Sequence, residues 1–458
     1  MAGYEFSREP QRVEFVETKH RRIQTMIPSP ETEQVLADLD KFESRSMLGQ
    51  LPIIWDKAID YNIFDPSGNK WIDFTSTIFV TNVGHANKNV IKALRDILDQ
   101  NLLHSYAYAT KIRANYIKEL VKSTPENFEK AFLLSAGTEA TEAALKLMRM
   151  NGQKIGKKKG GIVCFEGNWH GRTLGAQMMG GNESQKGWIG YRDPNIYHIP
   201  FPYPWLLKDQ LGEEFFQDSI EALEKQGVDL DTDICGFMIE TFQGWGAVFY
   251  PKDYIRAIEK FARKRGILLS FDEMQSGFAR TGKMFGYEHY GVTADLLCLG
   301  KGISNGMPLS AVVGKSEVMD LPGVGEMSST HSSNPVACAA GLATLQEINT
   351  KNLVAESERK GVIFHKYLNQ LKEKFPDRIS YILGKGMVAA VVFKDPETGG
   401  ADSLVCSRIS EICMQKGLLV VHTGRESIKL APPLTIPDDA LIEGLDVFSD
   451  SVSMAIQM

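Results

Sequence analysis

The chain has 458 residues, of which 43% are hydrophobic and 24% charged, and its formal net charge is −6. These values are typical of a globular protein that is long enough to form two or three domains. The charge balance gives no reason to expect a nucleic-acid partner, and no run of about 20 apolar residues predicts a membrane-spanning helix.

The first 50 residues are polar and contain two closely spaced prolines, Pro28 and Pro30. Their charged start resembles neither a signal peptide nor a transit sequence. The six cysteines are scattered without a CxxC pair, so we expect reduced thiols in a cytoplasmic protein. The next segment, "AIDYNIFDPSGNKWIDF" (residues 58–74), has alternating apolar positions around a Pro-Ser-Gly-Asn turn and predicts a β-hairpin.

From about Asn89 onwards, strand and helix patterns alternate. The stretch 131–137 predicts a strand that leads into a helix over 138–150, and 251–265 predicts an amphipathic helix. Further strands are expected at 160–165, 234–240, 266–273, 295–301 and 310–314. Such alternation predicts a mainly parallel sheet covered by helices on both faces.

The pattern changes after Pro335, where a long helix is expected over 335–348 and an α+β segment follows it. We therefore expect a large α/β domain over residues 76–335. A smaller α+β domain would combine the N-terminal segment, residues 1–75, with residues 336–458.

Two charged residues stand at the ends of expected strands. Lys301 follows the apolar run "LLCL" and lies between two glycines, and Asp272 ends the run "ILLSF". Ligands gather at the carboxyl ends of strands in sheets of this class, where a buried lysine and aspartate could pair around a charged cofactor. We expect the glycines beside Lys301 to leave room for that cofactor.

Further features fit the same ligand. Gly137 and Thr138 begin a helix whose free amides could hold a phosphate, and Trp169 offers a flat side chain for stacking. A lysine amine, a carboxylate for a ring nitrogen, a phosphate cup and a flat side chain are the set that pyridoxal 5'-phosphate needs.

Four segments of the chain form a recognisable set: "SAGTEATEAALKLMR", "NWHGRTLGA", "ILLSFDEMQSGFARTGKMFGYEHYGVTADLLCLGKGISNGMPLSAVVG" and "SSTHSSNPVACAAGLATL". Together they resemble the class III aminotransferases, a family of fold-type I pyridoxal-phosphate enzymes that includes ornithine and 4-aminobutyrate aminotransferases. The resemblance covers roughly residues 60–440 and is most specific between Asp272 and Lys301.

The resemblance assigns roles by position. It makes Lys301 the Schiff-base lysine and Asp272 the partner of the pyridinium nitrogen. It places Met274 under the ring, where the family usually has valine, and Gln275 at the ring hydroxyl. The remaining cofactor contacts are Gly137 and Thr138 at the phosphate, Trp169 on the ring, and Thr330 at the phosphate of a neighbouring subunit.

The implied activity moves an amino group from an amine or amino acid donor to a 2-oxo acid or other carbonyl acceptor. Because Thr330 would serve a neighbour's site, the resemblance also implies a homodimer or a dimer of dimers. No metal ion is expected.

The substrate pocket departs from the family pattern. Many relatives read E-P-V-Q-G-E-G where this chain reads "ETFQGWG", so Glu240 is kept but Trp245 replaces the second glutamate. Lys429 stands where many relatives have the arginine that binds a substrate carboxylate. A lysine can hold a carboxylate only as a point charge, unless Arg425 supplies the missing guanidinium. These changes favour an ω-amine, an amino sugar or another unusual donor over 4-aminobutyrate or ornithine.

Three alternatives stay open at this level. A racemase or epimerase of the same family has the same cofactor residues, and a catalytically silent protein could keep the fold. A nucleotide-binding module would need glycine at position 295 and serine or threonine after Lys301, but Asp295 and Gly302 stand there.

Overall fold

The computed structural model describes residues 4–47 and 50–457. The chain forms two compact units: a first unit of residues 1–88, 245–247 and 355–458, and a second unit of residues 89–244 and 248–354. The domain boundaries expected from the sequence, at residues 75 and 335, stay a prediction. Across the described ranges, no helix is both long and apolar enough to cross a membrane.

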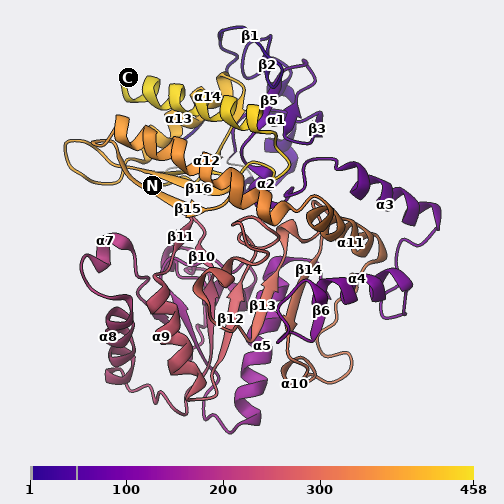
Figure 1. The fold of residues 1–458 in the computed structure, drawn as a ribbon, viewed down its shortest axis with the longest axis vertical. Coiled ribbons are helices and arrows are strands. Elements are labelled where there is room, and N and C mark those ends of the chain that lie inside the picture. The colour runs from indigo at the N-terminus through magenta and orange to yellow at the C-terminus, as the bar shows by residue number, and fades with distance from the viewer. Residues whose placement is uncertain (1–3, 48–49, 458) are drawn as a thin grey trace. The chain divides into compact units, whose positions relative to one another are not determined.

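A seven-stranded sheet forms the centre of the second unit (Figure 1). The strand order is β6-β14-β13-β12-β9-β7-β8, and only the two pairs that involve β14 are antiparallel. The mainly parallel sheet predicted from the sequence is therefore confirmed. Its strands are β6 (Lys130–Leu134), β7 (Gly161–Phe165), β8 (Ile196–Ile199), β9 (Ile234–Glu240), β12 (Leu268–Asp272), β13 (Leu296–Leu299) and β14 (Ser310–Gly314).

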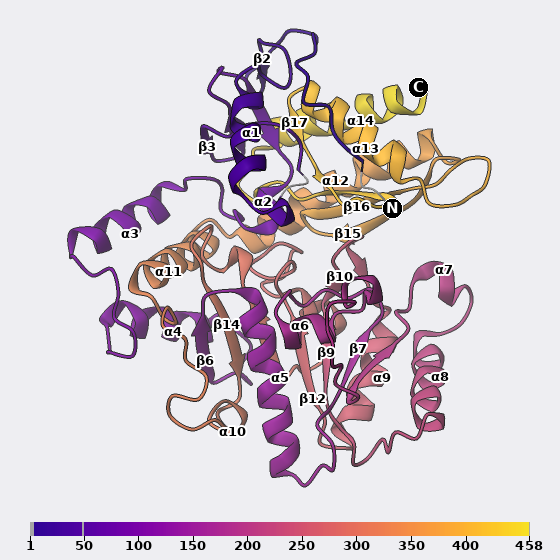
Figure 2. The same ribbon diagram turned by 180° about the vertical axis from the view of Figure 1, so that it is seen from behind.

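Helices cover both faces of this sheet, as Figures 1 and 2 show from opposite sides. The helix α5 (Gly137–Lys154) packs its alanines, Leu147 and Met148 against Met238 and Cys298. The neighbouring strand residue Phe237 points to the other face and meets Phe216 of α8 and Phe261 of α9. Because consecutive strand residues alternate between faces, continuous apolar runs such as "ICGFMI" are buried on both sides.

The second unit contains eight helices besides α5, three 3₁₀ turns and a small hairpin in its described residues. The helices are α3 (Lys88–Asp99), α4 (Lys111–Lys122), α6 (Leu174–Met179), α7 (Pro204–Leu207), α8 (Gly212–Lys225), α9 (Lys252–Arg263), α10 (Ser316–Met319) and α11 (Pro335–Thr350). The 3₁₀ turns are η2 (Glu183–Gln185), η3 (Gly286–Tyr290) and η4 (Lys301–Ile303), and a small hairpin joins β10 (Phe242–Gln243) to β11 (Val248–Phe249).

The first unit contains two sheets. One has the order β1-β2-β5-β4-β3 with β17 beside β5, and the other is antiparallel with the order β15-β16-β19-β18. The strands are β1 (Val16–Glu17), β2 (Arg22–Ile23), β3 (Lys57–Ile59), β4 (Asn62–Phe64), β5 (Lys70–Asp73), β15 (Ile379–Lys385), β16 (Val388–Phe393), β17 (Leu418–Leu419), β18 (Val421–His422) and β19 (Ser427–Leu430). The helices are α1 (Thr32–Phe42), α12 (Leu353–Lys374), α13 (Ser403–Gln415) and α14 (Asp438–Gln457), with the 3₁₀ turn η1 (Arg45–Met47).

The first unit contains the expected hairpin and a turn of unusual backbone conformation. The expected hairpin forms between β4 and β5, which pair antiparallel around residues 65–69. The short segment α2 (Ser76–Phe79) is a left-handed turn, because all four residues have positive φ, from 46° at Ser76 to 71° at Phe79. Left-handed backbone is unfavourable for non-glycine residues, so tertiary contacts must hold this turn. One of them is the bond that the Ser76 hydroxyl donates to the Ala431 carbonyl, at 2.6 Å.

Candidate active site

A cavity of about 190 Å³ in the second unit collects the strand-end residues. It holds seven of the eight predicted cofactor residues, together with Glu240: Gly137, Thr138, Trp169, Asp272, Met274, Gln275 and Lys301. Four further residues that the sequence reasoning did not single out complete the described lining: His170, Gly171, Phe242 and Ser276.

Asp272 ends β12 and is 5% exposed. Its Oδ2 lies 2.9 Å from Nδ1 of His170, and its Oδ1 accepts a bond from the Met274 backbone N–H at 3.1 Å. An ionised carboxylate can only accept, so the proton of the first bond lies on Nδ1. The other ring nitrogen, Nε2, is buried and has no hydrogen-bond partner among the described residues. His170 therefore fixes the direction in which the carboxylate points.

Lys301 follows β13 and begins η4 with a φ of +46°, a left-handed conformation that is uncommon for lysine. The side chain is half-buried and lines the cavity. Burial lowers the pKa of the Lys301 ammonium, and the carboxylates of Asp272 and Glu240 act in the opposite direction. A lysine of lowered pKa presents its neutral amine more readily, which suits it to act as a nucleophile or base.

Gly300 packs against the side chain of Met274. A Cβ atom on Gly300 would lie 2.4 Å from the sulfur of Met274, and one on Gly137 would lie 2.8 Å from the same atom. The Met274 thioether therefore occupies the space that both glycines leave. The expectation that the glycines beside Lys301 leave room for the cofactor stays a prediction.

The start of α5 lies against the loop that carries Trp169 and His170. A Cβ atom on Gly171 would lie 2.2 Å from Oγ1 of Thr138, and the Thr141 hydroxyl donates to the His170 carbonyl at 2.8 Å. The first turn of a helix offers backbone amides and a positive dipole end to an anion. This arrangement places that anion site beside Trp169.

Trp169 is held on two sides. Its backbone N–H donates to Oε2 of the buried Glu240 at 3.0 Å, and the guanidinium of Arg172 lies 4.4 Å from the centre of its ring. The side chain remains 37% exposed, so the indole keeps accessible surface. Glu240, predicted as a substrate residue, thus has a structural contact of its own with the loop.

The other predicted site residues are not part of the described lining of this cavity. Thr330 lies in an exposed loop of the second unit, where His104 Nε2 approaches its carbonyl at 2.8 Å, and it does not line the cavity. In the first unit, the guanidinium of Arg425 stacks 3.9 Å from the centre of the Trp245 ring. Lys429 is 5% exposed, and its ammonium lies 4.7 Å from the centre of the Phe79 ring.

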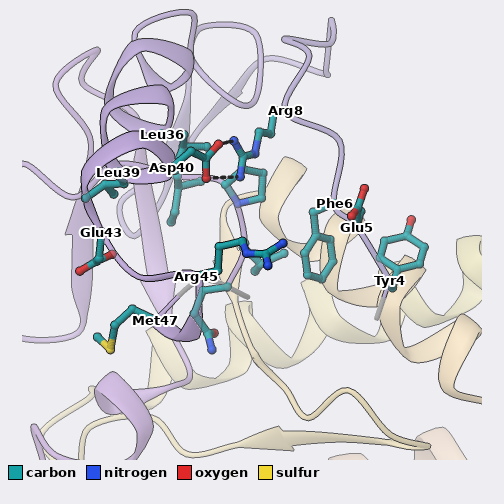
Figure 3. A pocket seen from close by; sticks show the side chains of 14 residues that line it. Tyr4, Glu5, Phe6, Arg8, Leu36, Leu39, Asp40, Glu43, Arg45 and Met47 are labelled. Atoms are coloured by element: carbon teal, nitrogen blue, oxygen red, sulfur yellow. Dashed lines mark hydrogen bonds and ion pairs between the residues drawn. The ribbon is translucent and has the colours of Figure 1, made fainter. Parts of the chain in front are cut away.

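A wider cavity of about 840 Å³ lies in the first unit, between the N-terminal segment and α1 (Figure 3). Arg8 and Asp40 form an ion pair across it, with a second bond of 3.2 Å between Nη2 and Oδ1, and Arg45 points into it. The described residues that line this cavity include no lysine, histidine or cysteine. It therefore lacks an amine that could form an imine with a carbonyl cofactor and is not the candidate active site.

The smaller cavity suits a flat ligand with charges at both ends. The α5 start would receive its phosphate, Asp272 would face a protonated ring nitrogen, and the Lys301 amine would bond to its carbonyl carbon. These residues fit pyridoxal phosphate. No cluster of metal-ligating side chains occurs in the described part of the chain.

His170 was missed because only Trp169 was considered in "NWHGRT". No local pattern links His170 to Asp272, because the two residues are 102 positions apart in the sequence. Phe242 and Ser276 give no signal either, because an apolar residue and a serine after a strand occur in any sheet.

Known proteins resemble this chain along most of its length. The family model described as aminotransferase class-III matches residues 45–452. The 4-aminobutyrate aminotransferase of Mycobacterium leprae is 32% identical over 444 residues, which cover 94% of this chain and 97% of that protein. The mitochondrial acetylornithine aminotransferase of Candida glabrata is 31% identical, with 87% and 90% covered. The mitochondrial ornithine aminotransferase of rice, Oryza sativa subsp. japonica, is also 31% identical, with 92% and 85% covered.

Solved structures show the same fold. A transaminase from the marine bacterium Virgibacillus superposes with a TM-score of 0.83 at 25% identity and covers 92% of this chain and 99% of its own. The ornithine aminotransferase of Toxoplasma gondii ME49 superposes with a TM-score of 0.82 at 24% identity, covering 93% and 96%. The fold class expected from the sequence is thereby confirmed.

Proposed function

The chain belongs to the class III aminotransferases, which depend on pyridoxal phosphate, and we propose that Lys301 and Asp272 are the residues through which it transfers amino groups. One observation carries this assignment: Asp272 ends β12, Lys301 follows the neighbouring parallel strand β13, and both residues line one cavity with Trp169 and the start of α5. The family establishes the aminotransferase activity, and the cavity supports the assignment of its residues.

Lys301 acts at two points in this proposal. Its Nζ would hold the carbonyl carbon of the cofactor. As a free amine, whose pKa burial lowers, it would take up and release the proton of the donor carbon. Bound pyridoxal phosphate supplies the electron sink that makes this proton removable.

Asp272 keeps a proton on the ring nitrogen by placing a buried negative charge beside it. His170 and the Met274 amide hold the carboxylate in one orientation, so the charge is preorganised before substrate arrives. Met274 and Trp169 would pack against the ring, Gln275 would reach the ring hydroxyl, and the amides of Gly137 and Thr138 would bind the phosphate.

The donor is proposed to be an ω-amine, an amino sugar or another amine without the carboxylate spacing of 4-aminobutyrate and ornithine. By the resemblance, Trp245 and Lys429 stand where many members of the family carry a glutamate and an arginine. Trp245 is already covered by Arg425, and the Lys429 ammonium lies over an aromatic face. The Lys429 ammonium is a point charge without the guanidinium fork, and the Arg425 guanidinium already faces the Glu426 carboxylate, with bonds of 3.2 and 3.4 Å.

The assembly and the location complete the proposal. Thr330 lies outside the cavity of its own chain, which supports a role at the phosphate of a second copy and hence a homodimer or a dimer of dimers. All six cysteines are free and buried, which supports a cytoplasmic location.

A donor screen tests the function. The enzyme with bound cofactor is mixed with single amines in the absence of an acceptor, and conversion of the cofactor to its amine form is followed by absorbance. A simple ω-amine or amino sugar should convert the cofactor fully, and 4-aminobutyrate should convert it slowly. A racemase would exchange the proton on the donor carbon without converting the cofactor, and that result would refute the assignment.

A further inference from the structure

A second buried carboxylate follows directly after Asp272. Glu273 is 0% exposed, and the described lining of the cavity does not include it. Its Oε1 accepts bonds from the Thr241 hydroxyl at 2.6 Å and the Tyr287 N–H at 2.7 Å. Its Oε2 accepts bonds from the Ser276 hydroxyl at 2.7 Å and the Gly286 N–H at 2.8 Å.

Four donors satisfy this carboxylate, and no cation pairs with it in the described part of the chain. Burial raises the pKa of Glu273, and the four hydrogen bonds oppose that shift. An apolar side chain of similar volume would avoid the desolvation cost of a buried charge. Packing alone therefore gives little reason for a carboxylate at this position.

The partners of Glu273 show what the bonds connect. Thr241, Glu273 and Ser276 each follow a cavity-lining residue in the sequence. The Thr241 backbone N–H also donates to the carbonyl of Asp272, at 3.2 Å. The neighbouring pairs are Glu240–Thr241, Asp272–Glu273 and Gln275–Ser276.

The two remaining donors, the Gly286 and Tyr287 amides, lie at the start of η3. A Cβ atom on Gly286 would lie 2.7 Å from Cβ of Ser276 and 2.9 Å from Cγ2 of Thr241. Only glycine allows this approach, and the approach brings the Gly286 and Tyr287 amides to the carboxylate. The network is thus tightly packed, with little freedom to rearrange around a missing bond.

We propose that Glu273 is a positioning residue that fixes the mutual spacing of Glu240, Asp272 and Gln275 around the cofactor. It touches neither cofactor nor substrate and acts through the backbone and hydroxyl groups that it joins. This inference rests on the proposed function of the cavity. It predicts that loss of the carboxylate loosens cofactor binding as well as the fold.

The test is Glu273→Gln in the enzyme with bound cofactor. The new amide NH₂ faces one backbone N–H and one hydroxyl, so the bond from the backbone N–H is lost and the hydroxyl must turn to accept. Cofactor release, followed by absorbance after dilution, should become at least about tenfold faster, the scale of a lost charge-assisted bond. Hydrogen exchange should rise in segments 240–243 and 272–277, and the visible band of the bound cofactor should shift.

Asp295→Asn is the matched control. Asp295 is also a buried carboxylate of the same sheet, where it accepts bonds from Arg263 at 2.6 Å and the Leu269 N–H at 2.8 Å, but it does not line the cavity. This variant should lower the melting temperature and leave cofactor release unchanged. If Glu273→Gln behaves in the same way, Glu273 is a structural residue and the inference is wrong.

Two milder variants keep the test decisive if Glu273→Gln does not fold. Ser276→Ala and Thr241→Val each remove one donor, and each should speed cofactor release by about threefold or more, the effect of a weak hydrogen bond. Unchanged release in both variants overturns the inference. A cofactor bound to a lysine other than Lys301 would refute the proposed site, whereas raised exchange in 240–243 and 272–277 would still support the positioning role of Glu273.

Discussion

Substitution of Asp272 by asparagine should slow proton transfer strongly and leave the fold intact. Asparagine has the same shape, and its amide oxygen can still accept the bond that the Met274 N–H donates at 3.1 Å. The change removes the negative charge beside the ring nitrogen and sets the amide NH₂ against Nδ1 of His170, so the 2.9 Å contact stays a hydrogen bond only if the imidazole proton moves to Nε2.

The size of the effect follows from the burial of this charge. Two unit charges about 4 Å apart interact by about 4 kcal/mol at an effective dielectric constant of about 20. Part of this energy already acts before the proton moves, and only the remainder changes the rate. We therefore expect a loss of about 2.7 kcal/mol in the transition state, which is about a hundredfold in rate.

The assay is a single-turnover half-reaction with a saturating donor, measured alongside cofactor content and melting temperature. Asp233→Asn is a suitable control, because Asp233 is a buried carboxylate that accepts bonds from Lys159 and the Asp229 N–H outside the cavity. The control should react at the normal rate. A near-normal rate in Asp272→Asn, with full cofactor content, would show that another group keeps the ring nitrogen protonated.

Three further results are expected. Gly300→Ala should destabilise the protein by about 1–3 kcal/mol through overpacking, and Met274→Val in the same chain should restore the melting temperature if the thioether is the clashing group. Trp245→Glu combined with Lys429→Arg should raise activity towards 4-aminobutyrate by about ten- to a hundredfold and non-additively; no gain, or full activity in the wild type, would contradict the proposed pocket. Sedimentation at micromolar concentration should give about twice the chain mass of 51.0 kDa or a multiple of it, and a fully active monomer would remove the proposed role of Thr330.

The fold could be predicted largely because its central strands are continuous apolar runs. The run that ends in Asp272 and the one that ends in Lys301 are buried on both faces, and such runs occur in parallel sheets covered by helices. The reversal of β14 was not visible, since an antiparallel strand buried on both faces has the same apolar composition. The left-handed turn at Ser76–Phe79 was also hidden, because its residues lack the glycine that usually marks positive φ.

In the site, residues were singled out because their chemistry is rare in a buried position, as for Lys301 and Asp272, and the structure brings these two into one cavity. Contacts between segments that are distant in the sequence were not predicted. His170 reaches Asp272 across 102 positions, and the sulfur of Met274 occupies the space above Gly300. Neither contact has a local signal, because side-chain packing decides both.

The assignment of Lys301 as the residue that carries the cofactor is tested most directly by chemical trapping. Borohydride reduction of the enzyme with bound cofactor, followed by proteolysis and mass spectrometry, should place the pyridoxyl group on the peptide that contains Lys301. Lys301→Ala should remove this label and all turnover while the melting temperature stays close to that of the wild type without cofactor. Label on any other lysine, or turnover in Lys301→Ala, would contradict the account.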